Sequence, residues 1–157
     1  MLIAHCSIPT DNPEATARTL AEILQGEALR FPPGGPGAWV AWSREGDISI
    51  EIVQRGHTIQ LDGDQGNWRS APMVARFSEA HVAICVDRPE SEIIAIASKA
   101  GWPARHCERG GGFFSLAEVW VDGAFMIEFL DPAQTAVYQQ RVTPANWKAK
   151  LSEMGAA

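Results

Sequence analysis

One short pattern occurs twice in this chain of 157 residues, and it constrains the fold more than any other feature. The first copy places His5 in the run Ala-His-Cys-Ser-Ile and, further along, Glu51 in the run Ile-Glu-Ile. The second copy places His81 in Ala-His-Val-Ala-Ile and Glu128 in Ile-Glu-Phe. The spacing between the two histidines differs by only one residue from the spacing between the two glutamates. Such agreement over half a chain indicates a duplicated module.

Each copy predicts the same order of elements, namely a strand, a helix and then three strands. Each helix has a proline in its first turn and a glycine at its end, as helix boundaries commonly do. The expected strands are 2–9, 27–31, 38–43 and 47–54 in the first copy and 80–87, 103–108, 114–121 and 124–130 in the second, with helices beginning at 13 and 89. We therefore expect an α+β fold of two tandem βαβββ modules at 1–55 and 79–132, a polar connector at 56–78, and a tail at 133–157 with a helix near 144–154.

The alternation of side chains along these strands separates the repeated residues from the aliphatic ones. Ile50 and Ile52 share one face of their strand, and Glu51 lies on the other. Aliphatic faces pack under helices, so His5, His81 and Glu128 are likewise expected on the sheet faces turned away from the helices. A carboxylate between apolar neighbours is unfavourable unless it is solvated or paired. A lone His or Glu on a strand is more often structural, but two of each at matching positions form a ligand set for a divalent metal.

Composition excludes several classes of function. The net charge of −6 and the pI near 5.2 argue against general binding to nucleic acid or to anionic membranes. No apolar run approaches the roughly 18 residues of a membrane span, and no secretory signal pattern opens the sequence. Three cysteines without a Cys-x-x-Cys pair fit free thiols in a reducing compartment, so we expect a cytoplasmic protein.

Three tryptophans of the central strands could wall a substrate pocket, although core packing is the usual role of such residues. They are Trp39, Trp42 and Trp120.

With these residues in view, the chain resembles the vicinal oxygen chelate superfamily, which includes glyoxalase I, bleomycin-resistance proteins, extradiol dioxygenases and fosfomycin-resistance enzymes. The resemblance covers roughly residues 1–132 and rests on Ala4-His5, Ile50-Glu51, Ala80-His81 and the closing segment Asp-Gly-Ala-Phe-Met-Ile-Glu that ends at Glu128. The proline usual in the turn before the last strand is absent. By this resemblance, residues 1–157 form a single glyoxalase-like domain.

The resemblance implies a metalloenzyme with lyase or isomerase chemistry of the glyoxalase I type. His5, Glu51, His81 and Glu128 would hold Zn²⁺, Ni²⁺, Co²⁺ or Mn²⁺, with iron less expected, and a small substrate would bind through two adjacent oxygens. Either Glu51 or Glu128 would then act as the base. Arg105 is among the basic residues available to hold an anionic part of the substrate, and a homodimer is expected.

Two alternatives stay open at this point. One is a non-catalytic protein that binds a small molecule, as bleomycin-resistance proteins do. The other is an Fe(II)-dependent dioxygenase of the extradiol type. Pairing of the two modules within one chain or between two chains is equally undecided.

Overall fold

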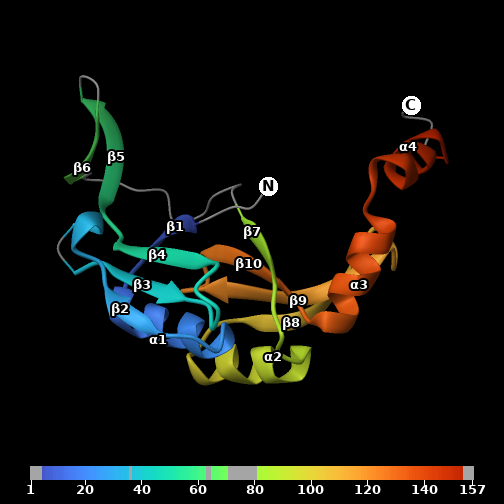
Figure 1. Cartoon of the computed structure of the whole chain (residues 1–157), viewed down its shortest axis with the longest axis horizontal. Helices are drawn as coiled ribbons and strands as arrows, with labels where there is room; N and C mark the ends of the chain where they lie inside the picture. Colours follow the sequence, from blue (N-terminus) through green and yellow to red (C-terminus); the bar gives the residue numbers. More distant parts are fainter. Residues whose placement is uncertain (1–4, 36, 63–64, 71–80, 154–157) are drawn as a thin grey trace.

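The computed structural model describes residues 5–35, 37–62, 65–70 and 81–153. The first module comprises β1 (His5–Thr10), α1 (Pro13–Ile23), β2 (Ala28–Arg30), the short 3₁₀ helix η1 (Pro32–Gly34), β3 (Trp39–Trp42) and β4 (Ser49–Gln54). The second comprises β7 (Val82–Cys85), α2 (Glu90–Lys99), β8 (Ala104–Arg109), β9 (Phe114–Val121) and β10 (Phe125–Leu130). The predicted α+β class and the two βαβββ modules are therefore confirmed (Figure 1). The predicted strand starts at 2–4 and at 80, and the helix end at 154, lie outside the described residues.

The two modules form separate sheets with the same topology. Their strand orders are β1-β4-β3-β2 and β7-β10-β9-β8, with the first pair of each parallel and the others antiparallel. The registers also match, because Ser7 pairs with Glu51 in the first sheet and Ala83 pairs with Glu128 in the second. The repeat seen in the sequence is thus a repeat of three-dimensional structure.

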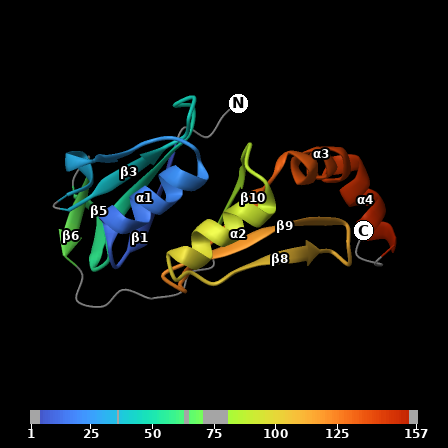
Figure 2. The same ribbon diagram turned by 90° about the horizontal axis from the view of Figure 1, so that it is seen from below.

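Helices α1 and α2 cover the same side of the two sheets and lie next to each other (Figures 1 and 2). One hydrophobic core fills the space between these helices and both sheets. Its fully buried members include the predicted aliphatic stripes of the strands, Ile8, Ile50, Ile52, Ile127 and Phe129. The opposite faces of the sheets, which we call the open faces, carry the alternate residues of each strand.

Local sequence explains where α1 begins, and a tertiary contact explains the glycine that follows it. The side chain of Asn12 accepts a hydrogen bond from the backbone N–H of Ala15, and Pro13 occupies the first turn. After the helix the chain passes so close to β3 that a Cβ atom at Gly26 would lie 2.0 Å from the carbonyl oxygen of Trp42. Gly26 is therefore required by the close approach of two backbone segments.

Two parts of the fold go beyond the sequence interpretation. The connector holds a two-stranded antiparallel ribbon, β5 (His57–Asp62) and β6 (Gln65–Ser70), which extends from the first module in Figure 1. The tail holds two helices, α3 (Pro132–Arg141) and the expected α4 (Pro144–Glu153). Asp131 starts α3 in a capping box with Gln134, and the ring of Tyr138 packs edge-to-face on Phe114 of β9. Within the described part of the chain, no helix is long and apolar enough to cross a membrane.

Candidate functional site

His5 and Glu51 form a close pair on the open face of the first sheet. Neighbouring strands β1 and β4 carry them, and His5 Nε2 lies 3.8 Å from Glu51 Oε1. The other carboxylate oxygen, Oε2, accepts a hydrogen bond of 2.6 Å from the hydroxyl of Ser7, which is the register partner of Glu51. Ser7 thereby fixes the carboxylate with one oxygen left next to the imidazole. We call these three residues the first half-site.

Cys6 lies between His5 and Ser7 in sequence but points to the other side of the sheet, where it packs against the core. Burial, and then the negative charge of Glu51, raise the pKa of the Cys6 thiol. A thiol in this environment stays protonated and does not add a thiolate ligand to the site.

The second sheet places Glu128 on its open face beside a guanidinium group. Arg109, at the end of β8, donates to Glu128 Oε1 from Nε at 3.1 Å and from Nη2 at 2.6 Å. Among the described residues, none donates a hydrogen bond to Glu128 Oε2. His81 directly precedes β7 and is exposed. We call His81 and Glu128 the second half-site.

A buried carboxylate, Glu118, anchors this arrangement. It is the register partner of Glu128 across β9 and β10, and its side chain is 3% exposed. Arg109 Nη2 donates to Glu118 Oε2 at 2.7 Å, while Arg105 Nη2 at 2.7 Å and Trp120 Nε1 at 2.8 Å donate to Oε1. We call Arg105, Arg109, Glu118 and Glu128 the ion-pair network.

The surroundings of Glu118 decide its charge. Burial by itself would raise the pKa of this carboxyl group, but the hydrogen bonds from Trp120, Arg109 and Arg105 outweigh it and lower the pKa to about 2. The hydrogen bond to Glu118 also raises the pKa of Arg109, against the opposing effect of burial. Glu118 is therefore an anion and Arg109 a cation at every physiological pH.

Neither Ser7 nor Glu118 was predicted from the sequence as a site residue, and Arg109 was only one of several basic residues available to hold an anionic group. Glu118 stands between Ala117 and Val119 in an apolar strand, which is the same signal that drew attention to the two repeated glutamates. Ser7 was detectable as the next residue on the face of β1 that carries His5. The position of Arg109 followed from no local pattern, because it depends on how β8 pairs with β9.

The structure separates the three predicted tryptophans. Trp42 pairs with Ser49 and Trp120 pairs with Met126, so these two rings occupy equivalent positions on the two open faces. Trp39 instead belongs to the buried core, with the guanidinium groups of Arg18 and Arg30 above its ring at 5.3 and 5.4 Å. Trp42 and Trp120 thus share faces with the candidate ligands, and Trp39 does not.

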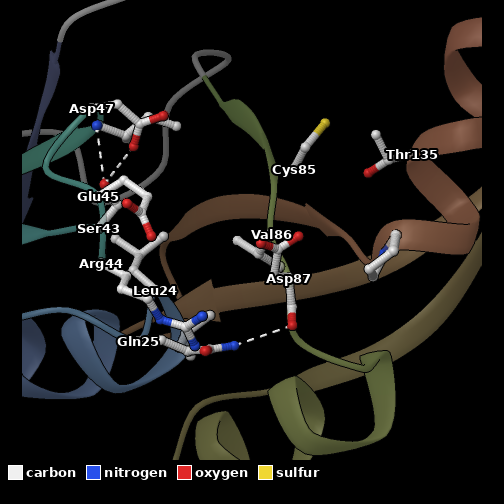
Figure 3. Close-up of a pocket in the computed structure, with 13 residues that line it drawn as sticks. Leu24, Gln25, Ser43, Arg44, Glu45, Asp47, Cys85, Val86, Asp87 and Thr135 are labelled. Atoms are coloured by element: carbon white, nitrogen blue, oxygen red, sulfur yellow. Dashed lines mark hydrogen bonds between the residues drawn. The ribbon is translucent and has the colours of Figure 1, made fainter.

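The described residues of one chain do not bring the two half-sites together. Throughout the described ranges, no three His, Cys, Asp or Glu side chains are grouped so that they could hold one metal ion. A groove of about 350 Å³ lies between the modules, lined by residues such as Gln25, Ser43, Asp47, Cys85 and Asp87 (Figure 3). None of the four candidate ligands lines this groove.

Comparison with solved structures identifies the fold. The fosfomycin resistance protein FosX from Mesorhizobium loti superposes with a TM-score of 0.53 at 15% sequence identity, over 85% of this chain and 94% of that one. FosX from Listeria monocytogenes, as a mutant in complex with Mn(II) and 1S,2S-dihydroxypropylphosphonic acid, gives 0.55 at 10% identity, over 88% and 95%. No family model matches the sequence, and no curated protein matches it either. The chain therefore has the vicinal oxygen chelate fold that its sequence resembles.

Proposed function

We propose that this protein is a divalent-metal enzyme of the glyoxalase type, with a metal held by His5 and Glu51 from one half-site and by His81 and Glu128 from the other. The pairing of His5 with Glu51 carries the proposal, because an imidazole nitrogen and a carboxylate oxygen lie 3.8 Å apart on one open face. The Mn(II) bound to FosX from Listeria, a protein of the same fold, supports a divalent ion such as Mn²⁺, Zn²⁺, Ni²⁺ or Co²⁺.

The first half-site has an arrangement that is typical of metal-binding carboxylates. Ser7 donates to one oxygen of Glu51, and the other oxygen lies beside the imidazole of His5. Carboxylates that bind metals in proteins are commonly oriented by an outer hydrogen bond of this kind.

A bound metal would supply Lewis-acid stabilisation of negative charge on two adjacent substrate oxygens. The chain itself would supply a carboxylate, Glu51 or Glu128, to take a proton from the substrate. Trp42 and Trp120 would pack against the substrate from the two open faces, and the exposed guanidinium of Arg105 lies next to Trp120 in a depression of about 410 Å³.

We further propose a homodimer in which the first half-site of one copy meets the second half-site of its partner. This proposal is supported by the separation of the half-sites, since the described residues of one chain bring no three donors together. A two-fold arrangement of two copies would create two identical sites.

The test is elemental analysis of protein purified without chelator. We expect about one Zn, Mn, Ni or Co per chain in the wild type and less than about a tenth of this in His5→Ala and in Glu128→Ala. The matched control is His106→Ala, because His106 lies outside both half-sites and contacts Glu90. A wild-type protein that stays free of metal after reconstitution would refute the proposed metal-dependent activity.

A second function, metal-free binding of a small molecule, is favoured by one specific observation. Glu128 already has a cation beside it in Arg109, so its charge is compensated by the protein itself. In that case Trp42 and Trp120 alone would hold a ligand. Quenching of tryptophan fluorescence by a ligand, undiminished in His5→Ala, would support this second function over the first.

A further inference from the structure

Two carboxylates lie directly opposite each other on the open face of the second sheet. Glu118 and Glu128 are register partners on β9 and β10, a position in which like charges destabilise a sheet. Arg109 resolves this conflict, because its Nη2 donates to both carboxylates, at 2.7 Å to Glu118 and at 2.6 Å to Glu128. The guanidinium of Arg109 therefore bridges the two carboxylates and compensates part of their negative charge.

The positive and negative charges of the ion-pair network are equal in number. Arg105 and Arg109 carry two positive charges, and Glu118 and Glu128 carry two negative ones. The four side chains of the network thus balance one another's charges, and the buried Glu118 holds Arg109 in place.

Among the described residues, no arginine bridges a pair of carboxylates in the first half-site. In the register of the first sheet, Leu29 and Val40 stand where the second sheet has Arg105 and Glu118. Glu51 is held instead by the neutral hydroxyl of Ser7. The duplicated modules have therefore diverged in the electrostatics around their two glutamates.

We infer that Arg109 is an internal counter-cation for Glu128, which stabilises the second half-site without a metal and weakens the binding of a divalent metal to Glu128. The statement about metal rests on the proposed function, whereas the pairing with Glu128 stands without it. The physical reason is that a fixed positive charge within hydrogen-bond distance of a ligand carboxylate repels a divalent cation bound to the same carboxylate.

The pairing is tested first in metal-free protein by a double-mutant cycle. Arg109→Gln removes the charge and is expected to lower the Tm by roughly 6–12 °C, because it leaves two carboxylates without their shared cation. In a Glu128→Gln background the same substitution should lower the Tm by only about half as much, since one of the two carboxylates is already neutral. Equal losses in the two backgrounds would overturn the pairing.

The effect on metal is tested by titrating Mn²⁺ and Zn²⁺ into metal-free protein and measuring Kd by calorimetry. Arg109→Gln, which removes the charge, is expected to bind about tenfold more tightly than the wild type. Arg109→Lys keeps the charge and should stay within about threefold of the wild type. Arg18→Gln is the matched control, because it also removes one positive charge but lies on α1, where Arg18 pairs with Glu14, and it should stay within about threefold of the wild type.

Weaker binding by both Arg109→Gln and Arg109→Lys would overturn the inference, because Arg109 would then serve only to orient Glu128 for the metal. Failure of the proposed function gives a different result. If none of the proteins binds Mn²⁺ or Zn²⁺, or if His5→Ala binds as tightly as the wild type, the metal site is refuted, while the Tm values of the double-mutant cycle still decide the pairing of Arg109 with Glu128.

Discussion

Glu118 provides a sharp test of the electrostatics of the second sheet. Its side chain is 3% exposed and receives hydrogen bonds from Arg105, Arg109 and Trp120. Its pKa falls from an ordinary value of 4.5 to about 2 in the folded protein. A change of this size corresponds to about 3 kcal/mol of stabilisation at neutral pH. Glu118→Gln removes this contribution.

The direction of the pH dependence follows from the two pKa values. Because the folded-state pKa lies below the unfolded-state pKa, the stabilisation is fully present above about pH 4.5 and is lost as the pH falls toward 2. The free energy of unfolding of the wild type should therefore exceed that of Glu118→Gln by about 3 kcal/mol at pH 7. At pH 3 the difference should have shrunk by about 2 kcal/mol.

Urea unfolding followed by circular dichroism at several pH values measures this difference directly. Glu108→Gln is the control, because Glu108 is an exposed glutamate on the neighbouring strand β8. Its stability should stay within about 0.5 kcal/mol of the wild type at every pH. A difference between wild type and Glu118→Gln that is the same at pH 7 and pH 3 would show that Glu118 is not a buried anion of the native state.

Three further predictions concern the first half-site and the core. Ser7→Ala removes the hydrogen bond that orients Glu51 and should weaken Mn²⁺ or Zn²⁺ binding by about tenfold in calorimetry; unchanged affinity would remove Ser7 from the site. Phe129→Ala opens a cavity at a fully buried position and should lower the free energy of unfolding, measured in urea, by about 3–5 kcal/mol. A loss below about 1 kcal/mol would contradict the burial of Phe129 in the core. Gly26→Ala should lower the Tm by several degrees, because its Cβ would meet the Trp42 carbonyl oxygen at 2.0 Å, and a Tm equal to that of the wild type would contradict this close approach.

Much of the fold was predictable because its determinants are local. The alternation of Ile50, Glu51 and Ile52 identifies which face is buried, since a strand has a period of two. Asn12 and Pro13 mark the start of α1 through a cap and a backbone constraint that lie within the segment itself. Duplication added a second, independent copy of each signal.

Two missed elements also had local signals. The ribbon of β5 and β6 follows an alternation of polar and apolar residues over 58–61 and an Asp-Gly dipeptide at 62–63, which are hairpin signals. The start of α3 follows Asp131-Pro132 with Gln134 in the position of a capping box. Both signals are only a few residues long, and they lie within long polar segments that show no clear periodicity.

The ion-pair network could not be predicted in the same way. Glu118 and Glu128 face each other only because the turn at Asp122 and Gly123 fixes the register of β9 and β10. Arg109 reaches both carboxylates only because β8 pairs with β9 in one particular register. Both contacts depend on how neighbouring strands pair. The pattern of residues within one strand does not predict that pairing.

Mixing two inactive variants shows whether one metal site is built from half-sites of two chains. His5→Ala and Glu128→Ala are each expected to bind no Mn²⁺. After subunit exchange in an equal mixture, half of the dimers carry one of each variant and have one intact site, so we expect binding at roughly a quarter of the wild-type stoichiometry. Absence of recovered binding in a mixture that demonstrably forms mixed dimers would refute a metal site shared between two chains.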